Sequence, residues 1–401
     1  MTAGSVLHQV YREDRARMLA ALIRVLGDFE LAEDALQDAC ALALGKWGDT
    51  PPDDPVAWLL TAARNSAIDR LRRARLGREK LAQLGERPEA VMTVADVGLL
   101  GVGDERLSLV FTCCHPALAE DARVALTLQA VAGMTAGQIA RMFLVGESTL
   151  AQRLVRAKRK IRDAGIRLRV PADDVLPERL SGVLAVVYLI FTQGYTAAGD
   201  DTSRREAIRL GKLVAILMPD QPEALGLVAL LLLHDSRSAT RFDPEGDVVL
   251  LADQDRSRWD HAEIAEAIGL LDRALRLGRP GPYQLQAAIA ALHAQAASSE
   301  ETDWAGIVGL YDRLLVVAPS PVVALNHAVA VAMATTPDEG LTLIDQIVGL
   351  DRYHLLHAAR ADLLRRLDRR DEAAVAYRRA HELAVNPADR RFLAGRLRDL
   401  D

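Results

Sequence analysis

Apolar residues recur three or four positions apart along much of residues 6–80, which is the spacing of one face of an α-helix. The apolar positions fall into three stretches: Leu19, Leu22, Ile23 and Leu26; Leu31, Ala35, Leu36, Ala39, Leu42 and Ala43; and Val56, Trp58, Leu59, Ala62, Ile68 and Leu71. Pro51, Pro52 and Pro55 interrupt the chain before the third stretch. We therefore predict three helices here, with Trp58 in their core.

A helix–turn–helix is predicted further along the chain. Val124, Leu126 and Leu128 mark a buried helix. Thr135 is placed to cap a short second helix, and Ser148, after the tight turn Val-Gly-Glu, to cap a third. Two short helices joined by such a turn have the spacing of a DNA-binding motif. A plain helical hairpin is the alternative.

The last helix of this motif is amphipathic. Leu150, Leu154, Ala157 and Ile161 lie on its apolar side, and Gln152, Arg153, Arg156 and Arg159 lie opposite. Glutamine and arginine side chains suit base edges and phosphates in the major groove.

The region from residue 179 onward reads as paired helices with a weak internal repeat. Apolar or small residues recur at one constant interval: Tyr311, Ile344 and Tyr377; Leu314, Ile347 and Ala380; and Ala328 and Ala361. This interval is close to the period of the tetratricopeptide (TPR) repeat, which is about 34 residues, so we expect a TPR-like domain of helix pairs. A plain all-α domain with chance periodicity is the alternative.

Composition and charge agree with a helical protein that binds a polyanion. Of the 401 residues, 50% are hydrophobic but only 4% aromatic, which favours close-packed helices, and three cysteines are too few for a disulfide scaffold. Residues 1–170 carry a net charge of +3 and residues 171–401 a net charge of −9. Two blocks, residues 64–80 and 153–169, concentrate the basic side chains. One such block alone can be a solvated helix face, but two blocks, each at the end of an amphipathic helix, favour binding to a polyanion. No apolar run approaches the ~20 residues that span a bilayer, so we expect a cytoplasmic protein with no membrane partner.

No group of residues indicates an enzyme. Cys113, Cys114 and His115 lack the second cysteine pair of a metal site, so we expect buried thiols beside a capping histidine. The pairs His354–His357 and His234–Asp235 have no further ligands near them in sequence. We predict no catalytic residues, no metal and no cofactor.

Three strings in order, AEDALQDACALALGKW, PVAWLLTAARNSAIDRLRRARLGREK and the helix–turn–helix, resemble an extracytoplasmic-function (ECF) sigma factor of the sigma-70 type. The strings FTCCHPAL, YLIFTQGY, LVALLLLHD, DQDRSRWD, GPYQLQAAIAA and SPVVALNHAVAVA resemble the subgroup with a long TPR-like extension. The resemblance implies an all-α protein with a sigma-2 domain (1–83), a linker (84–104), a sigma-4 helix–turn–helix domain (105–170), a junction (171–178) and a TPR-like extension (179–401).

The resemblance also implies partners and site residues. It predicts that Asn65 reads an extruded −10 base, with Arg64, Asp69, Arg70, Arg72, Arg73 and Arg75 beside it. It places Ser148, Thr149, Gln152, Arg153, Arg156, Lys158 and Arg159 at the −35 element. The partners would be promoter DNA and core RNA polymerase, through its β flap and the β′ clamp helices; the clamp helices would meet Glu33, Asp34, Gln37 and Asp38. A fused extension implies no separate anti-sigma factor.

Tyr188, Phe191 and Tyr195 form the one aromatic-rich stretch near the junction. They either pack within the junction or couple the extension to the sigma domains. The function implied is promoter recognition by a sigma factor whose extension modulates it. The alternatives are a helix–turn–helix regulator with a TPR sensor that acts without polymerase, and a peptide-binding scaffold.

Overall fold

The structure, a computed structural model, describes residues 3–48, 50–82, 105–143, 145–195 and 201–400. These residues form eighteen α-helices and three short 3₁₀ turns, and the only extended pairing among them is an isolated bridge between Phe242 and Val248. The predicted all-α fold is therefore confirmed. The chain divides into two compact units, residues 1–190 and 191–401. The predicted linker, 84–104, lies outside the described residues.

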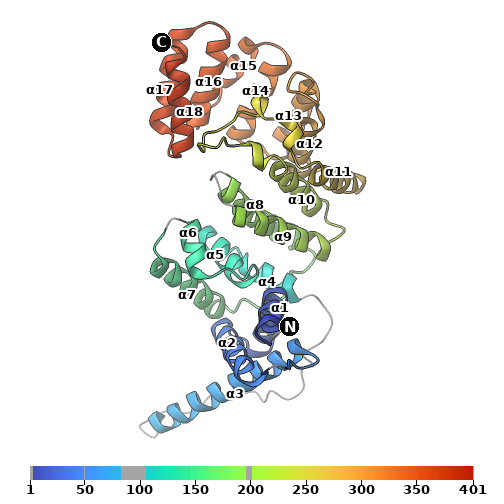
Figure 1. The fold of residues 1–401 in the computed structure, drawn as a ribbon, viewed down its shortest axis with the longest axis vertical. Coiled ribbons are helices and arrows are strands. Elements are labelled where there is room, and N and C mark those ends of the chain that lie inside the picture. The colour runs from blue at the N-terminus through green and yellow to red at the C-terminus, as the bar shows by residue number, and fades with distance from the viewer. Residues whose placement is uncertain (1–2, 49, 83–104, 144, 196–200, 401) are drawn as a thin grey trace. The chain divides into compact units, whose positions relative to one another are not determined.

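The first three helices are α1 (Ala3–Leu26), α2 (Phe29–Lys46) and α3 (Pro55–Ala82), which pack against one another (Figure 1). Leu19 and Leu22 of α1, Leu36 of α2 and Leu59 of α3 are almost fully buried between them. Trp58 was predicted in this core, but it is only half-buried. It lies one position before Leu59, on the flank of α3, where its ring meets the edge of Trp47 with centroids 5.5 Å apart.

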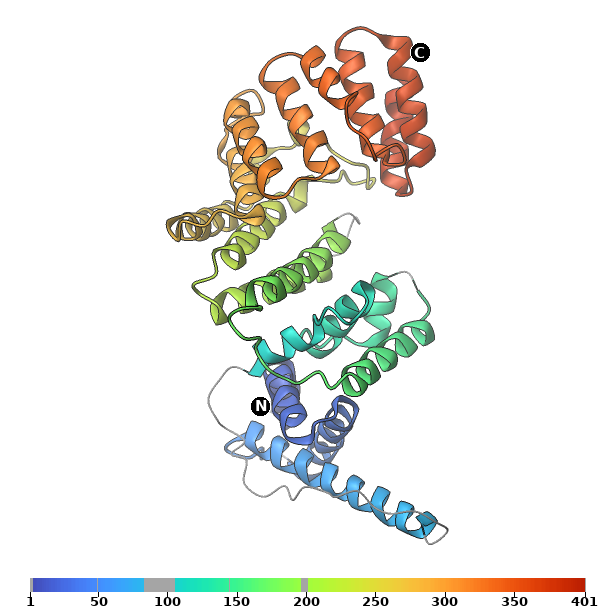
Figure 2. The ribbon, with the colours of Figure 1, turned by 180° about the vertical axis from the view of Figure 1, so that it is seen from behind.

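The helix–turn–helix region comprises α4 (Glu105–Cys113), α5 (Glu120–Ala130), α6 (Ala136–Met142) and α7 (Glu147–Asp163) (Figure 2). Helix α4 packs on both α1 and α5, and α5 and α6 pack on α7. Phe111, Leu126, Leu128 and Ile139 are fully buried in this region. The two helical groups therefore belong to one compact unit.

Helix α8 (Leu176–Tyr195) begins at the predicted junction and crosses the boundary between the two units, which falls after Ile190. Arg179 near its start donates a 2.7 Å hydrogen bond to the carbonyl oxygen of Phe111 in α4. The first part of α8 is thus tied to the helix–turn–helix region.

In the second unit, α10 (Pro222–Asp235) lies against α9 (Asp201–Leu217), α11 (His261–Arg276) and α12 (Pro282–Gln295). Helices α10 and α12 approach closely at Gly226, where a Cβ atom would lie 2.7 Å from Gln284 Cγ and 2.8 Å from its backbone nitrogen. Glu223 one turn earlier accepts hydrogen bonds from the backbone N–H groups of Tyr283 and Gln284, which caps the start of α12.

The remaining helices repeat at the interval that the sequence indicates. Helices α13 (Trp304–Val317), α15 (Pro337–Ile344) and α17 (Arg370–Leu383) begin at equal steps along the chain, and α14 (Pro321–Ala334), α16 (His354–Arg366) and α18 (Pro387–Arg398) begin at the same step. Each helix packs on the next for most of this series (Figure 2). Residues at equivalent positions, Ala328 and Ala361, are both fully buried, so small side chains allow close helix contact at the same point of successive pairs.

Candidate promoter and polymerase interfaces

The helix–turn–helix begins with a reciprocal cap. The Thr135 hydroxyl accepts a hydrogen bond from Gln138 N, and the Gln138 side chain accepts one from Thr135 N at 2.8 Å. This is a capping box, and it confirms Thr135 as the N-cap of α6. Ser148 does not cap α7, because the N-cap of this helix is Gly146. Glycine has no side chain, so the start of α7 has no side-chain cap. Ser148 lies inside the first turn of α7 and is exposed.

Helix α7 presents one apolar and one polar face, as predicted. Leu150, Leu154, Ala157 and Ile161 are buried. Of the residues predicted at the −35 element, five are exposed: Ser148, Thr149, Gln152, Arg156 and Arg159. A solvated face with one amide and two guanidinium groups has the chemistry for base edges and phosphates.

Two other predicted −35 residues have protein partners in this structure. Arg153 is half-buried, forms an ion pair of 3.2 Å with Asp121 of α5, and lies over the Phe143 ring. Lys158 is buried and forms an ion pair with Glu33 of α2. In this conformation the exposed basic face of α7 is therefore narrower than the sequence indicates.

The predicted −10 residues lie on α3. Asn65, Asp69 and Arg72 are exposed and Arg64 is half-buried. Arg70 instead donates hydrogen bonds to Asp38 at 2.9 Å and to Asp34 at 2.7 Å on α2. Arg73 and Arg75 fall within α3, but their side chains lie outside the described part of the structure.

The predicted polymerase-binding side chains on α2 differ in their surroundings. Gln37 and Asp34 are exposed, whereas Asp38 accepts hydrogen bonds from both Arg70 and the Ser66 hydroxyl. Glu33 has the least exposed side chain of the three carboxylates, at 12%. Asp34 is also paired, with Arg70 at 2.7 Å, but its side chain is 53% exposed, so Gln37 and the outer side of Asp34 are the parts of this set that solvent still reaches.

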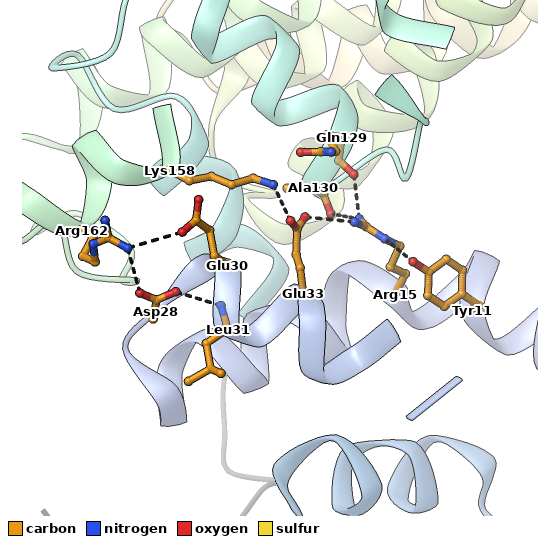
Figure 3. A network of polar contacts seen from close by, with 10 residues as sticks. All are labelled: Tyr11, Arg15, Asp28, Glu30, Leu31, Glu33, Gln129, Ala130, Lys158 and Arg162. Atoms are coloured by element: carbon orange, nitrogen blue, oxygen red, sulfur yellow. Dashed lines mark hydrogen bonds and ion pairs between the residues drawn. The ribbon is translucent and has the colours of Figure 1, made fainter. Parts of the chain in front are cut away.

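Glu33 lies at the centre of a polar network that joins the first helices to the helix–turn–helix (Figure 3). It accepts from Lys158 on one side and lies 3.4 Å from Arg15 Nη2 on the other. Arg15 also donates hydrogen bonds of 2.7 and 2.8 Å to the carbonyl oxygens of Gln129 and Ala130, at the C-terminal end of α5. We call Arg15, Glu33 and Lys158 the Glu33 cluster.

At the rim of this contact, the Arg162 guanidinium lies 3.4 Å from Asp28 and 3.5 Å from Glu30 (Figure 3). These side chains are more exposed than those of the Glu33 cluster, so solvent screens this contact more strongly. The sequence placed Glu33 and Lys158 in two different interfaces, and it did not indicate Arg15 at all. The one available signal was the opposite charge of α2 and α7.

Cys113 and Cys114 are buried, as predicted. Burial raises the pKa of the Cys114 thiol to about 11 and places that of Cys113 well above its usual value. His115 Nδ1 accepts a hydrogen bond of 3.1 Å from Ala117 N and so closes the turn after α4. Among the described residues, no three His, Cys, Asp or Glu side chains are grouped so as to hold a metal ion.

The aromatic stretch in α8 is half-buried at Tyr188 and Tyr195 and fully buried at Phe191. The rings of Phe191 and Tyr195 stack with centroids 5.3 Å apart. A coupling role between the units remains a prediction. In the part of the chain that the structure describes, no helix is long and apolar enough to cross a membrane.

Three family models match the chain. Residues 10–76 match "Sigma-70 region 2", residues 108–161 match "Sigma-70, region 4", and residues 179–275 match a "Family of unknown function (DUF6596)". The first two models cover the α1–α3 group and the helix–turn–helix. The third begins in α8 and ends in α11.

Two kinds of relative are similar to the chain. "Uncharacterized protein R00370" of Rhizobium meliloti is 42% identical over 391 residues, which is 94% of this chain and 92% of that protein. "ECF RNA polymerase sigma factor SigK" of Mycobacterium bovis is 28% identical over 162 residues, 39% of this chain and 83% of SigK. The Mycobacterium ulcerans SigK is 28% identical over 178 residues, 40% of this chain and 91% of that protein.

Regions 2 and 4 occur here in the order in which sigma factors carry them, and they imply core RNA polymerase and promoter DNA as partners. The exposed polar faces of α3 and α7 lie within these two regions. The chain belongs to the ECF group of sigma-70 factors and carries a DUF6596 region after its two sigma regions.

Proposed function

We propose that this sigma factor directs core RNA polymerase to promoters with −10 and −35 elements, and that residues 179–401, a TPR-like extension, modulate this activity. The exposed face of α7 carries the proposal. Gln152, Arg156 and Arg159 lie on the second helix of the helix–turn–helix and are exposed to solvent. The polymerase performs the chemistry, so the proposal assigns this chain no catalytic step, and it needs no separate anti-sigma factor.

The role proposed for region 2 rests on the exposed surface of α3. Asn65 is exposed, and its amide can both donate to and accept from a base edge. Arg72, about two helical turns further along, is exposed and suited to a phosphate. Arg70 is bound to Asp34 and Asp38, and would reach DNA only by leaving them.

Regions 2 and 4 must separate for both to bind one promoter. Elements at −10 and −35 are about 25 base pairs apart by their names, which is roughly 85 Å of duplex. In this structure Glu33 of region 2 and Lys158 of region 4 form an ion pair. We therefore propose that the Glu33 cluster holds a closed form of the free protein, which opens when polymerase and promoter bind.

The chain between the two regions is long enough for this opening. From the end of α3 at Ala82 to the start of α4 at Glu105 there are 22 intervening residues. At about 3.3–3.6 Å per residue, such a segment reaches at most about 79 Å when fully extended, and the helices of the two regions themselves cover the rest of the roughly 85 Å. Region 4 can thus leave region 2 without any helix having to unfold.

Transcription in vitro tests the proposed function. Purified core polymerase and a panel of promoter fragments from the source genome are incubated with and without the full chain. Promoter-specific transcripts that require this chain support the proposal. Tight duplex binding without polymerase, together with no such transcripts, would favour the alternative, a helix–turn–helix regulator.

A reversible crosslink tests the opening step. In the native protein Glu30 Oε2 and Arg162 Nη1 lie 3.5 Å apart. In a Glu30→Cys, Arg162→Cys variant, a short reducible crosslinker joins the two cysteines. The crosslinked protein should lose transcription and regain it on reduction, while either single variant stays active. Full activity of the crosslinked form would refute a required opening.

A further inference from the structure

The connection between α10 and α11 is unusually long for a compact helical domain. It runs from residue 236 to residue 260, and it contains three 3₁₀ turns. Hydrogen bonds hold it in one shape: Trp259 Nε1 donates to the Thr240 hydroxyl at 3.0 Å, and Asp260 N donates to the Ser236 carbonyl oxygen at 2.7 Å. Ordered connections of this length are usually functional.

This connection brings three arginines to one place. The Arg241 Cζ atom lies 3.4 Å from the centre of the Tyr195 ring, and the Arg237 Cζ atom lies 5.8 Å from the same ring. Arg256 donates a 2.8 Å hydrogen bond to the carbonyl oxygen of Ala296, after α12. We call Arg237, Arg241 and Arg256 the arginine cluster.

Two histidines complete the site. His234 Nδ1, at the end of α10, lies 3.4 Å from Arg237 Nη2 and 3.5 Å from the Tyr195 hydroxyl. The His293 ring of α12 packs against Trp304, and the His293 backbone carbonyl oxygen accepts a hydrogen bond from Arg256. Burial, followed by the nearby arginines, lowers the pKa of His234 well below its usual range and that of His293 to about 4. Both rings are therefore neutral at pH 7, and the positive charge resides on the arginines.

No described carboxylate forms an ion pair with any arginine of the cluster. Their neighbour Arg204 shows the contrast, since it is paired with Asp235 at 2.5 Å and with Asp201 at 2.7 Å. Burial and the charge of Arg237 lower the pKa of both Arg241 and Arg256, although Glu300 acts on Arg256 in the opposite sense. The cluster is thus a concentration of positive charge within an extension, residues 179–401, whose net charge is −6.

Unpartnered buried atoms lie at the same place. Arg256 Nη2 and His293 Nδ1 are both buried without a hydrogen-bond partner among the described residues. A buried polar group in this state costs about 1–3 kcal/mol. The three half-buried arginines also lie near one another, and their mutual repulsion adds to this cost. Both effects destabilise the folded protein when no ligand is bound. Such local conflicts are typical of binding sites.

We infer that the arginine cluster binds an oxyanion, the carboxylate or phosphate group of a small molecule, between Arg237, Arg241 and Arg256. The guanidinium group presents a planar fork of donors that matches these oxyanions. Stacking of Arg241 on Tyr195 would orient one fork before the ligand arrives. The inference rests on the second unit alone and does not depend on the proposed sigma-factor function.

Isothermal titration calorimetry of the full chain tests this site. The probes are inorganic pyrophosphate and succinate, and the buffer contains neither phosphate nor carboxylate. We expect saturable binding of at least one probe, and the probe that binds distinguishes a phosphate from a carboxylate ligand. Arg237→Gln or Arg241→Gln should weaken binding by about 10-fold to 100-fold, as expected for one hydrogen bond to a charged group. Arg379→Gln is the matched control, because Arg379 is an exposed arginine of α17 paired with Glu382 in the same helix, and it should bind as the unaltered protein does.

Thermal unfolding without any probe separates binding from folding. Because the arginines repel one another, Arg241→Gln should not lower the unfolding temperature more than Arg379→Gln does. If a Gln variant fails to fold, Arg241→Lys decides, since it keeps the charge and loses the fork, and it should still bind more weakly. Saturable binding of neither probe, or equal binding by the Arg237 and Arg241 variants and the control, would overturn the inference.

Discussion

Lys158 of α7 and Glu33 of α2 form a buried ion pair between residues 125 positions apart in sequence. The pair joins sigma region 4 to sigma region 2, and Arg15 of α1 completes it from the other side of Glu33. It takes one side chain from the predicted DNA-binding set and one from the predicted polymerase-binding set. The same charges that suit two external partners thus satisfy each other in this conformation.

Glu33→Gln should destabilise the first unit by about 3–5 kcal/mol, because Lys158 would remain buried without a counter-charge. Urea unfolding gives the free energy, and hydrogen exchange of α2 and α7 assigns the transition to this unit. Glu33→Gln combined with Lys158→Met should recover much of the loss. The control Glu382→Gln breaks an exposed pair with Arg379 and should cost at most about 1 kcal/mol. Equal losses for the two single variants would show that the Glu33 cluster does not hold the regions together.

Polymerase binding should depend on the exposed part of α2. Asp34→Lys and Gln37→Lys should each weaken binding to core RNA polymerase, because they place positive charge opposite the basic clamp helices that the family resemblance implies. Affinity is measured with labelled full-length protein, and circular dichroism confirms the fold. Asp371→Lys, an exposed acidic residue in the first turn of α17, is the matched control. Unchanged affinity in both α2 variants would remove this surface from the interface.

Promoter readout should divide between α3 and α7. Asn65→Ala should reduce discrimination at one −10 base by about 1–3 kcal/mol, and Gln152→Ala should do so at the −35 element. Arg153→Ala is a poorer probe than the sequence indicates, since its loss also frees Asp121. Transcription from single-base promoter variants measures the effect. A uniform loss on every promoter would mean that these side chains contact phosphates or support the fold.

Deleting residues 191–401 should lower promoter-directed transcription, since we expect the extension to assist the active assembly as well as restrain it. A cut at residue 190 follows the boundary between the units and preserves the Arg179 bond to Phe111, whereas a cut at residue 178 removes it. Simple masking of the sigma regions predicts higher activity instead. Equal transcription from both proteins would exclude both roles.

Tyr195→Ala should reproduce part of the deletion effect, because it removes the ring that stacks on Phe191 and supports Arg241. Tyr195→Phe keeps the ring and loses the contacts of the hydroxyl with His234 and Arg241, so it should retain most of the activity. Both variants are compared in the same transcription assay. Full activity of Tyr195→Ala would separate this aromatic stretch from the function of the extension.

The buried thiols should resist alkylation at pH 8. The pKa of Cys114 is raised to about 11, so the reactive thiolate is scarce until the pH approaches that value, and burial limits access further. Mass spectrometry after iodoacetamide treatment should find Cys113 and Cys114 unmodified in the native protein and modified in urea. Rapid labelling of the native protein would contradict a purely structural role.

The sequence alone determined the features that depend on local periodicity. The α7 faces, the Thr135 cap, the buried positions of the C-terminal repeat and the order of the two sigma regions all follow from patterns along the chain. Helical spacing decides which side chains share a face, and this requires no knowledge of neighbouring helices. The assignment to helices and to a family therefore needed no coordinates.

Only the tertiary structure decided which side chains are paired and which are free. Whether Lys158 faces DNA or Glu33, and whether Arg70 faces a phosphate or Asp34, depends on which helices pack together, since the partners are distant in sequence. Trp58 is not in the core because it lies on the flank of α3, against the edge of Trp47. Ser148 is not the N-cap of α7 because the helix already begins after Gly146. The arginine cluster is likewise assembled by a long connection with no periodic pattern, so its charges converge only in three dimensions.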